Sequence, residues 1–326
     1  MKKAMFLLVV GVFILSYGSS KAAYPDREIT FITSHAAGTS TDLAIRVLSE
    51  VASKVLGQTI VIMNKPGASY VIGNSQVINS KPDGYTLGFC YAGAFTHVPH
   101  MRKIPYDIKK DITWIGTCGD YTGGLVVKPD APWKTLREFL DDAKKNPDKI
   151  IYSHDGYGLF LHVLMEYIAL KEGGIKWKFL PIPGGPRQAT ALLGGHTHAW
   201  AAGGFHVPFV RDKTMRLLVN FDKTRLKIQP EIPTLWEFGY ETSLSSLGSY
   251  TLFGPKGIPE AILEKLEDAY RKAVNDPSFA KLMDTFAVTP YFQNSTETGK
   301  KIYEEFDAMG KLVKITGVKT ELEEKK

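Results

Sequence analysis

Cysteine is scarce in this sequence, and long apolar runs are missing from most of it. Only Cys90 and Cys118 occur among its 326 residues, which excludes a framework of several disulfides. One bridge and two separate, semi-buried thiols both stay open. After residue 22 no apolar stretch approaches the roughly 20 residues that a membrane-spanning helix needs. The length predicts a globular chain of about two domains.

A strong excess of charge is also missing. The formal net charge is +6, and Lys2, Lys3 and Lys21 lie in a leading segment without acidic residues, so removing that segment lowers the net charge to +3. Such an ordinary balance gives little support for nucleic-acid binding, which we do not expect.

The first residues have the pattern of a secretory signal. Two lysines after Met1 precede a short apolar run, 4–15, and a small, polar stretch follows through Ala22. This order is typical of a signal peptide, residues 1–22, that is cleaved after Ala22. Neither cysteine stands where a lipid would be attached. We therefore expect an exported, soluble protein in the periplasm, without a lipid anchor.

Strands and helices alternate twice along the rest of the chain. Strands are expected at 28–33, 59–64, 85–91, 149–153, 176–181, 197–201 and 215–221, and helices at 41–56, 70–79, 159–171, 187–193, 259–275 and 296–315. This alternation predicts two α/β units, each a mostly parallel sheet flanked by helices. Apolar runs that end in proline, at 125–129 and 250–255, are typical of chain crossings. They divide the chain into lobe 1, residues 23–125 plus 250–326, and lobe 2, residues 126–249.

A small-residue loop at 34–42 leads from the end of a strand into a helix. Free N–H groups and the positive end of the helix dipole meet at such a place, and a carboxylate is a natural ligand for them. The plainer interpretation is that Ser40 or Thr41 caps the helix and Gly38 makes the turn. Asp42, in the first turn, must point away if an anion binds.

Three similar helix starts lie in the second lobe, at 153–158, 184–186 and 203–204. Together the four loops predict a cleft lined by backbone donors at the carboxyl ends of the sheets. Several aromatic residues in or beside the loops would suit a flat or aromatic acid. The predicted ligand-binding residues are Ala37, Gly38, Thr39, Ser40, Thr41, Tyr91, Ala94, Phe95, Gly156, Tyr157, Gly158, Leu159, Phe160, Gly184, Gly203 and Phe205.

Signals for an enzyme or a metal protein are weak. Ser153, His154 and Asp155 are successive residues, so they cannot form a catalytic triad. No nucleophile elbow, P-loop or dinucleotide fingerprint occurs. His196 and His198 share one face of a strand without ligand partners at defined spacing. We expect no catalytic residues, no metal site and no cofactor.

Several motifs resemble the substrate-binding receptors of tripartite tricarboxylate transporters, the Bug (Bordetella uptake gene) family. The resemblance covers essentially the whole chain after the leader. The motifs, in order, are 24–30 (YPDREIT), 36–42 (AAGTSTD), 64–68 (NKPGA), 82–87 (PDGYTL), 105–107 (PYD), 192–195 (LLGG) and 232–239 (IPTLWEFG).

This resemblance implies a two-lobed periplasmic-binding-protein fold of the Venus flytrap type. It implies a receptor that loads small carboxylic acids into a membrane permease. By the same resemblance, the loop at 38–41 grips one carboxylate and the loop at 156–160 meets the distal part of the ligand.

The chain departs from the family's pattern in the second lobe. Leu159, Phe160 and Leu161 replace small hydroxyl residues, Pro183 replaces a polar residue, and His198 replaces an aspartate. Fewer donors and more apolar surface disfavour a citrate-like ligand, so a monocarboxylate or an aromatic acid is expected. We expect the protein to be a monomer. Two alternatives stay open: a ligand-sensing subunit for a membrane kinase, and a secreted hydrolase or metal-binding protein.

Overall fold

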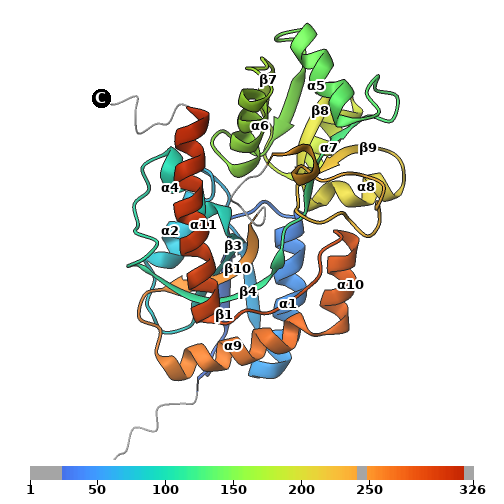
Figure 1. The fold of residues 1–326 in the computed structure, drawn as a ribbon. Coiled ribbons are helices and arrows are strands. Elements are labelled where there is room, and N and C mark those ends of the chain that lie inside the picture. Colours follow the sequence, from blue (N-terminus) through green and yellow to red (C-terminus); the bar gives the residue numbers. More distant parts are fainter. Residues whose placement is uncertain (1–23, 241–247, 319–326) are drawn as a thin grey trace, which may run out of the picture.

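The computed structural model describes residues 24–240 and 248–318. The predicted signal peptide, residues 1–22, lies outside the described residues. Two five-stranded sheets form two lobes, one below the other in Figure 1. Within the described residues, no helix has both the length and the apolar character needed to cross a membrane.

The two sheets share one topology. The first sheet has the order β2-β1-β3-β10-β4, and the second has the order β7-β6-β8-β5-β9. The strands of the first are β1 (Ile29–Thr33), β2 (Ile60–Asn64), β3 (Thr86–Tyr91), β4 (Ile112–Asp120) and β10 (Ser249–Pro255). Those of the second are β5 (Gly123–Val127), β6 (Ile151–His154), β7 (Lys178–Pro181), β8 (Ala199–Gly203) and β9 (Arg216–Asn220). The lobes are thus structural repeats without a sequence repeat.

Each sheet is mixed rather than mostly parallel. In the first, β1 pairs in parallel with β2 and β3, whereas β10 is antiparallel to β3 and β4. In the second, β6 pairs in parallel with β7 and β8, whereas β5 is antiparallel to β8 and β9. The antiparallel strand in each sheet is one that enters from the other lobe, so its direction is opposite to that of the strands built by β-α-β units. The two-lobed α/β fold is confirmed.

The first crossing between the lobes is short. The chain leaves the first sheet after Asp120 and joins the second at Gly123, and it is back in the first sheet at Ser249. We therefore draw the first boundary at residues 121–122, because 123–125 are strand residues of the second sheet.

Helices cover both sheets. They are α1 (Ser40–Leu56), α2 (Val71–Ile78), α3 (Gly93–Thr96), α4 (Val98–Met101), α5 (Leu136–Lys145), α6 (Phe160–Lys171), α7 (Gly185–Leu193), α8 (Val207–Arg211), α9 (Glu260–Val274), α10 (Pro277–Thr285) and α11 (Ser295–Thr316). Short 3₁₀ turns, η1 (Gly204–His206) and η2 (Trp236–Phe238), lie in the second lobe. The predicted end of α1 is confirmed, because Gly57 takes the left-handed conformation that glycine adopts without strain.

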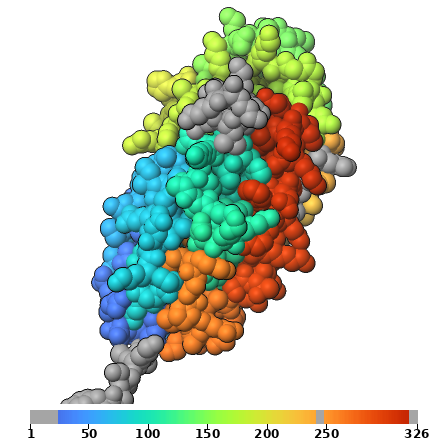
Figure 2. Space-filling model, turned by 90° about the vertical axis from the view of Figure 1, so that its left-hand side faces the viewer, coloured from blue at the N-terminus to red at the C-terminus, as the bar shows by residue number. Residues whose placement is uncertain are grey.

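The lobes touch each other at several points, one of them at the first crossing. The rings of His97 and Phe160 lie 5.1 Å apart, and those of Phe205 and Phe286 lie 6.4 Å apart. Thr122 donates a 2.9 Å hydrogen bond to the carbonyl of Phe286. Helix α11, red in Figure 2, extends from the first lobe to the second, where it packs on α6. These contacts hold the two carboxyl edges of the sheets against each other.

Both cysteines are free and buried in the first lobe. Cys90 belongs to β3 and Cys118 to β4. Burial raises the pKa of Cys90 to about 12, so this thiol stays protonated. The sequence left open either one disulfide or two separate thiols, and this structure has two separate thiols.

Candidate functional site

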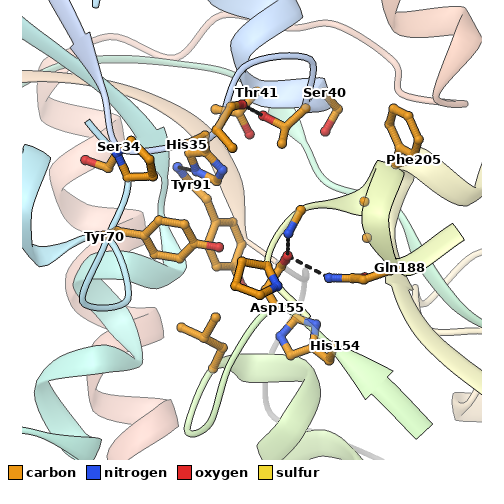
Figure 3. Close-up of a pocket in the computed structure, with 18 of the residues that line it drawn as sticks. Ser34, His35, Ser40, Thr41, Tyr70, Tyr91, His154, Asp155, Gln188 and Phe205 are labelled. Carbon is orange, nitrogen blue, oxygen red and sulfur yellow. Dashed lines mark hydrogen bonds between the residues drawn. The ribbon is translucent and has the colours of Figure 1, made fainter. Parts of the chain in front are cut away.

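A cavity of about 220 Å³ lies between the lobes, at the ends of the strands. Figure 3 shows His35, Tyr70 and Tyr91 from the first lobe on one side, and His154, Asp155 and Gln188 from the second lobe on the other. Eight predicted residues line it: Thr39, Ser40, Thr41, Tyr91, Leu159, Gly184, Gly203 and Phe205. The site therefore takes its walls from both lobes.

The start of α1 leaves two N–H groups without a helical partner. Thr39 is the N-cap, and its hydroxyl accepts the N–H of Asp42 at 3.3 Å. The N–H of Leu43 already donates to the carbonyl of Thr39 at 2.9 Å. The N–H groups of Ser40 and Thr41 belong to the first turn, which has no preceding carbonyls to bind, and both residues line the cavity.

Asp42 does point away from the cavity. Its carboxylate accepts the N–H of Gly38 at 2.9 Å, the Arg46 guanidinium at 3.1 Å and the Asn64 amide at 2.7 Å. Burial alone would raise the pKa of Asp42, but these bonds and the charge of Arg46 together lower it. The Gly38 N–H is thus bound by the protein, and Gly38 itself does not line the cavity.

The start of α6 repeats this arrangement with different residues. The N–H of Gly158 donates to Nδ1 of His162 at 3.3 Å, again from a glycine to the side chain four residues later. Gly158 has φ +73°, close to the +80° of Gly38. Leu159 is the N-cap and offers no side-chain hydrogen bond, so Phe160 and Leu161 begin the helix uncapped. Leu159 and Leu161 line the cavity.

At the other two loops, the amides of Gly184 and Gly204 are bound by the protein. The N–H of Gly184 donates to Oδ1 of Asp155 at 2.8 Å. The N–H of Gly204 donates to the carbonyl of Thr122 at 2.8 Å. The starts of α1 and α6, one from each lobe, therefore border the cavity, and Gly185 adds the first residue of α7.

Half of the predicted site residues lie elsewhere. Ala94 and Phe95 are buried, and the Phe95 ring packs edge-on against Trp114 and Phe253. Phe160 packs on His97, whereas Tyr157 is 53% exposed beside His162. Ala37, Gly38, Gly156 and Gly158 belong to the binding loops but do not line the cavity. His198 accepts the N–H of Ile151 at 3.0 Å and so has a structural contact.

An aromatic wall forms the first-lobe side of the cavity. His35 stacks on Tyr70 with ring centroids 4.6 Å apart. Tyr91 meets Tyr121 edge-on at 5.1 Å, and Tyr121 stacks on Tyr250 at 4.1 Å. The hydroxyls of Tyr121 and Thr41 are hydrogen-bonded to each other, which ties this wall to the start of α1.

Several lining residues were missed from the sequence, above all the loop 66–70. Ala68, Ser69 and Tyr70 all have positive φ angles, of 46°, 51° and 74°. This turn carries Tyr70 over His35. The motif at 64–68 was a signal for this loop that the site prediction did not use. The other missed residues are Ser34, His35, Ala36, Tyr121, His154, Asp155, Leu161, Pro183, Gly185, Gln188 and Trp200.

The cavity contains little positive charge. No lysine or arginine lines it within the part of the chain that the structure describes. Burial lowers the pKa of His35 to about 4 and that of His154 to about 3, so both imidazoles are neutral near pH 7. The amide donors must therefore provide most of the attraction for an anion.

Comparison with known proteins identifies the family. The sequence profile described as "Tripartite tricarboxylate transporter family receptor" matches residues 44–318. The chain belongs to this family of periplasmic solute-binding receptors. It is 36% identical over 280 residues to the "UPF0065 protein in gbd 5'region" of Cupriavidus necator, covering 84% of this chain and 83% of that protein.

Solved structures of similar receptors share the fold. The periplasmic binding protein BugD has a TM-score of 0.83 and 26% identity, covering 91% of this chain and all of that chain. MatC from Rhodopseudomonas palustris, solved with bound malate, has a TM-score of 0.79 and 23% identity, covering 89% of this chain and 100% of that one. The resemblance to the Bug receptors that the sequence motifs indicated is confirmed.

The carboxylate of Asp42 should stabilise the receptor in a pH-dependent way. Its folded-state pKa is lowered, so its contribution is present above the ordinary value of 3.8 and is lost as the pH falls through the lower folded-state value. We expect Asp42→Asn to lower the free energy of unfolding at pH 7 by about 1–3 kcal/mol. Urea denaturation should show a smaller difference at pH 3.

Asp212→Asn is the matched control, because Asp212 is exposed and distant from this network. It should change the free energy of unfolding little at either pH. An Asp42→Asn variant as stable as the unchanged protein at pH 7 would contradict the proposed network.

Proposed function

We propose that this receptor captures a small carboxylic acid between its lobes and delivers it to a tripartite tricarboxylate-type membrane permease. The observation that carries the proposal is the meeting of two helix starts on one cavity between the lobes, at Ser40 in the first lobe and at Leu159 and Leu161 in the second. An acid group bound there would be attracted by first-turn N–H groups and by the helix dipoles.

Hinge closure is the proposed mechanism. A ligand that contacts both lobes binds the closed state more tightly than the open one and so shifts the population toward closure. The short crossing at 121–122 is a suitable hinge, because it is the point where β4 and β5 change sheets. No bond of the ligand is made or broken, and neither a cofactor nor a metal takes part.

The ligand class we favour is a monocarboxylate or an aromatic acid. The wall of Tyr70, Tyr91 and Tyr121 offers flat apolar surface. The lack of lysine and arginine among the described lining residues disfavours ligands with several negative charges. The malate held by MatC supports a carboxylate as the recognised group in this fold.

Export fits this role. We propose that residues 1–22 are a signal peptide, cleaved after Ala22, and that the mature receptor acts in the periplasm as a monomer. Its partners would be the acid and the integral-membrane subunits of the permease, with no role for nucleic acid.

Calorimetry with a panel of mono-, di- and tricarboxylic and aromatic acids tests the ligand class. We expect selective binding of a monocarboxylic or aromatic acid, together with a rise in Tm, because a ligand that binds only the folded state stabilises it. Tight binding of citrate, with no binding of monocarboxylic or aromatic acids, would contradict this assignment.

A pair of substitutions at Ser40 tests the amide donors. Proline is tolerated at the first helical position, and Thr39 already has the extended conformation that precedes proline. Ser40→Pro therefore removes one N–H while the helix persists, and we expect affinity for the acid to fall about tenfold or more. Ser40→Ala keeps that N–H and should weaken binding less, by roughly 0.5–1 kcal/mol.

Circular dichroism should first establish that both variants are folded. Equal and negligible effects of the two substitutions on the dissociation constant would count against the start of α1 as the acid site.

A further inference from the structure

Asp155 places a carboxylate in the wall of the cavity, at the end of β6 in the second lobe. It is the one aspartate or glutamate among the described lining residues, and no lysine or arginine accompanies it there. A carboxylate in a partly desolvated site is costly unless a positive charge or donors compensate it. A receptor for anions would be expected to avoid such a group.

The hydrogen bonds that Asp155 makes within the protein use one of its carboxylate oxygens and do not require its negative charge. Oδ1 accepts the N–H of Gly184 at 2.8 Å and Nε2 of Gln188 at 2.7 Å. Both bonds hold the start of α7. The carbonyl oxygen of an asparagine would accept the same two bonds, so these bonds do not require a charged residue. Within the described part of the chain, Oδ2 accepts no hydrogen bond.

The charge of Asp155 acts across the cavity on the aromatic wall. Burial, and after it the charge of Asp155, raises the pKa of Tyr70, whereas burial and Glu305 come before Asp155 among the causes that raise the pKa of Tyr91. Burial also raises the pKa of Asp155 itself, and the bonds from Gly184 and Gln188 and the nearby His35 oppose that rise. Figure 3 shows Tyr70 and Asp155 directed into the same space from opposite lobes. The faces of Tyr70 and Tyr91 add to this negative potential, because aromatic faces attract cations.

We propose that Asp155 binds a positively charged nitrogen of the ligand and makes the receptor selective for acids that also carry an ammonium or another protonated nitrogen. This inference rests on the proposed function, in which the start of α1 binds the acid group. One end of the ligand would then meet the amides of Ser40 and Thr41, and the other would meet Asp155 and the tyrosine faces. Dicarboxylates would be disfavoured, because their second carboxylate would face Asp155.

Two sets of matched acids test this by calorimetry on the full mature chain. The aromatic set is para-aminomethylbenzoate, para-methylbenzoate and terephthalate. The aliphatic set is pentanoate with a terminal amino group, pentanoate itself and adipate. Within each set the group far from the first carboxylate is cationic, neutral or anionic. In a set that binds, we expect the ammonium member to bind about tenfold or more tightly than the neutral one, and the dicarboxylate to bind most weakly.

Asp155→Asn should remove this preference. The substitution keeps the size of the side chain and its bonds to Gly184 and Gln188, so the fold should persist. We expect affinity for the ammonium probe to fall about tenfold or more, with that for the acid with a neutral tail changed much less and that for the dicarboxylate increased. Asp212→Asn, which removes an exposed carboxylate outside the cavity, should leave all three affinities unchanged.

The outcomes separate this inference from the proposed function. If a dicarboxylate binds the unchanged protein more tightly than both ammonium probes, or if Asp155→Asn leaves the ranking as it was, the role of Asp155 is overturned and the receptor function stands. If neither set nor any acid of the wider panel binds, the proposed function fails and the inference fails with it.

Discussion

The binding cleft depends on how the first turn of α1 distributes its hydrogen bonds. Asp42 would compete with an acidic ligand for the positive end of the helix, but the Gly38 N–H, Arg46 and Asn64 hold its carboxylate outside the cavity. The N-cap hydroxyl of Thr39 accepts the N–H of Asp42. In the proposed function, the donors that border the cavity are left for a ligand, so that this helix start can bind an anion.

The second lobe uses the same geometry with apolar and imidazole side chains. His162 binds the Gly158 N–H where Asp42 binds that of Gly38. Because Leu159 gives no side-chain cap, this helix start is more apolar than that of α1. With neutral His35 and His154 around it, the cavity has little positive potential of its own. Recognition therefore has to depend on directed amide bonds, aromatic contact and the placement of Asp155.

Much of the fold was predictable from periodicity, whereas the pairing between lobes was not. The stripe of Leu43, Val47 and Val51 and the terminal Gly57 predicted α1 closely. Strand β4 was missed because its partner β10 lies far along the chain and Gly116 interrupts its alternation. Helix α5 was missed although Leu136, Phe139, Leu140 and Ala143 recur at helical spacing. In the site, Thr39, Ser40, Thr41 and Leu159 of the two predicted loops do line the cavity. Asp155 and Tyr70 meet only when the lobes dock, which no local pattern encodes.

The most direct test of the central claim is a crystal structure of the receptor with a bound acid from the calorimetric panel. The account predicts a carboxylate oxygen within about 3.2 Å of the main-chain nitrogen of Ser40 or Thr41, with the ligand enclosed by both lobes. An acid bound elsewhere, or one held in this cavity without contact to either nitrogen, would contradict it.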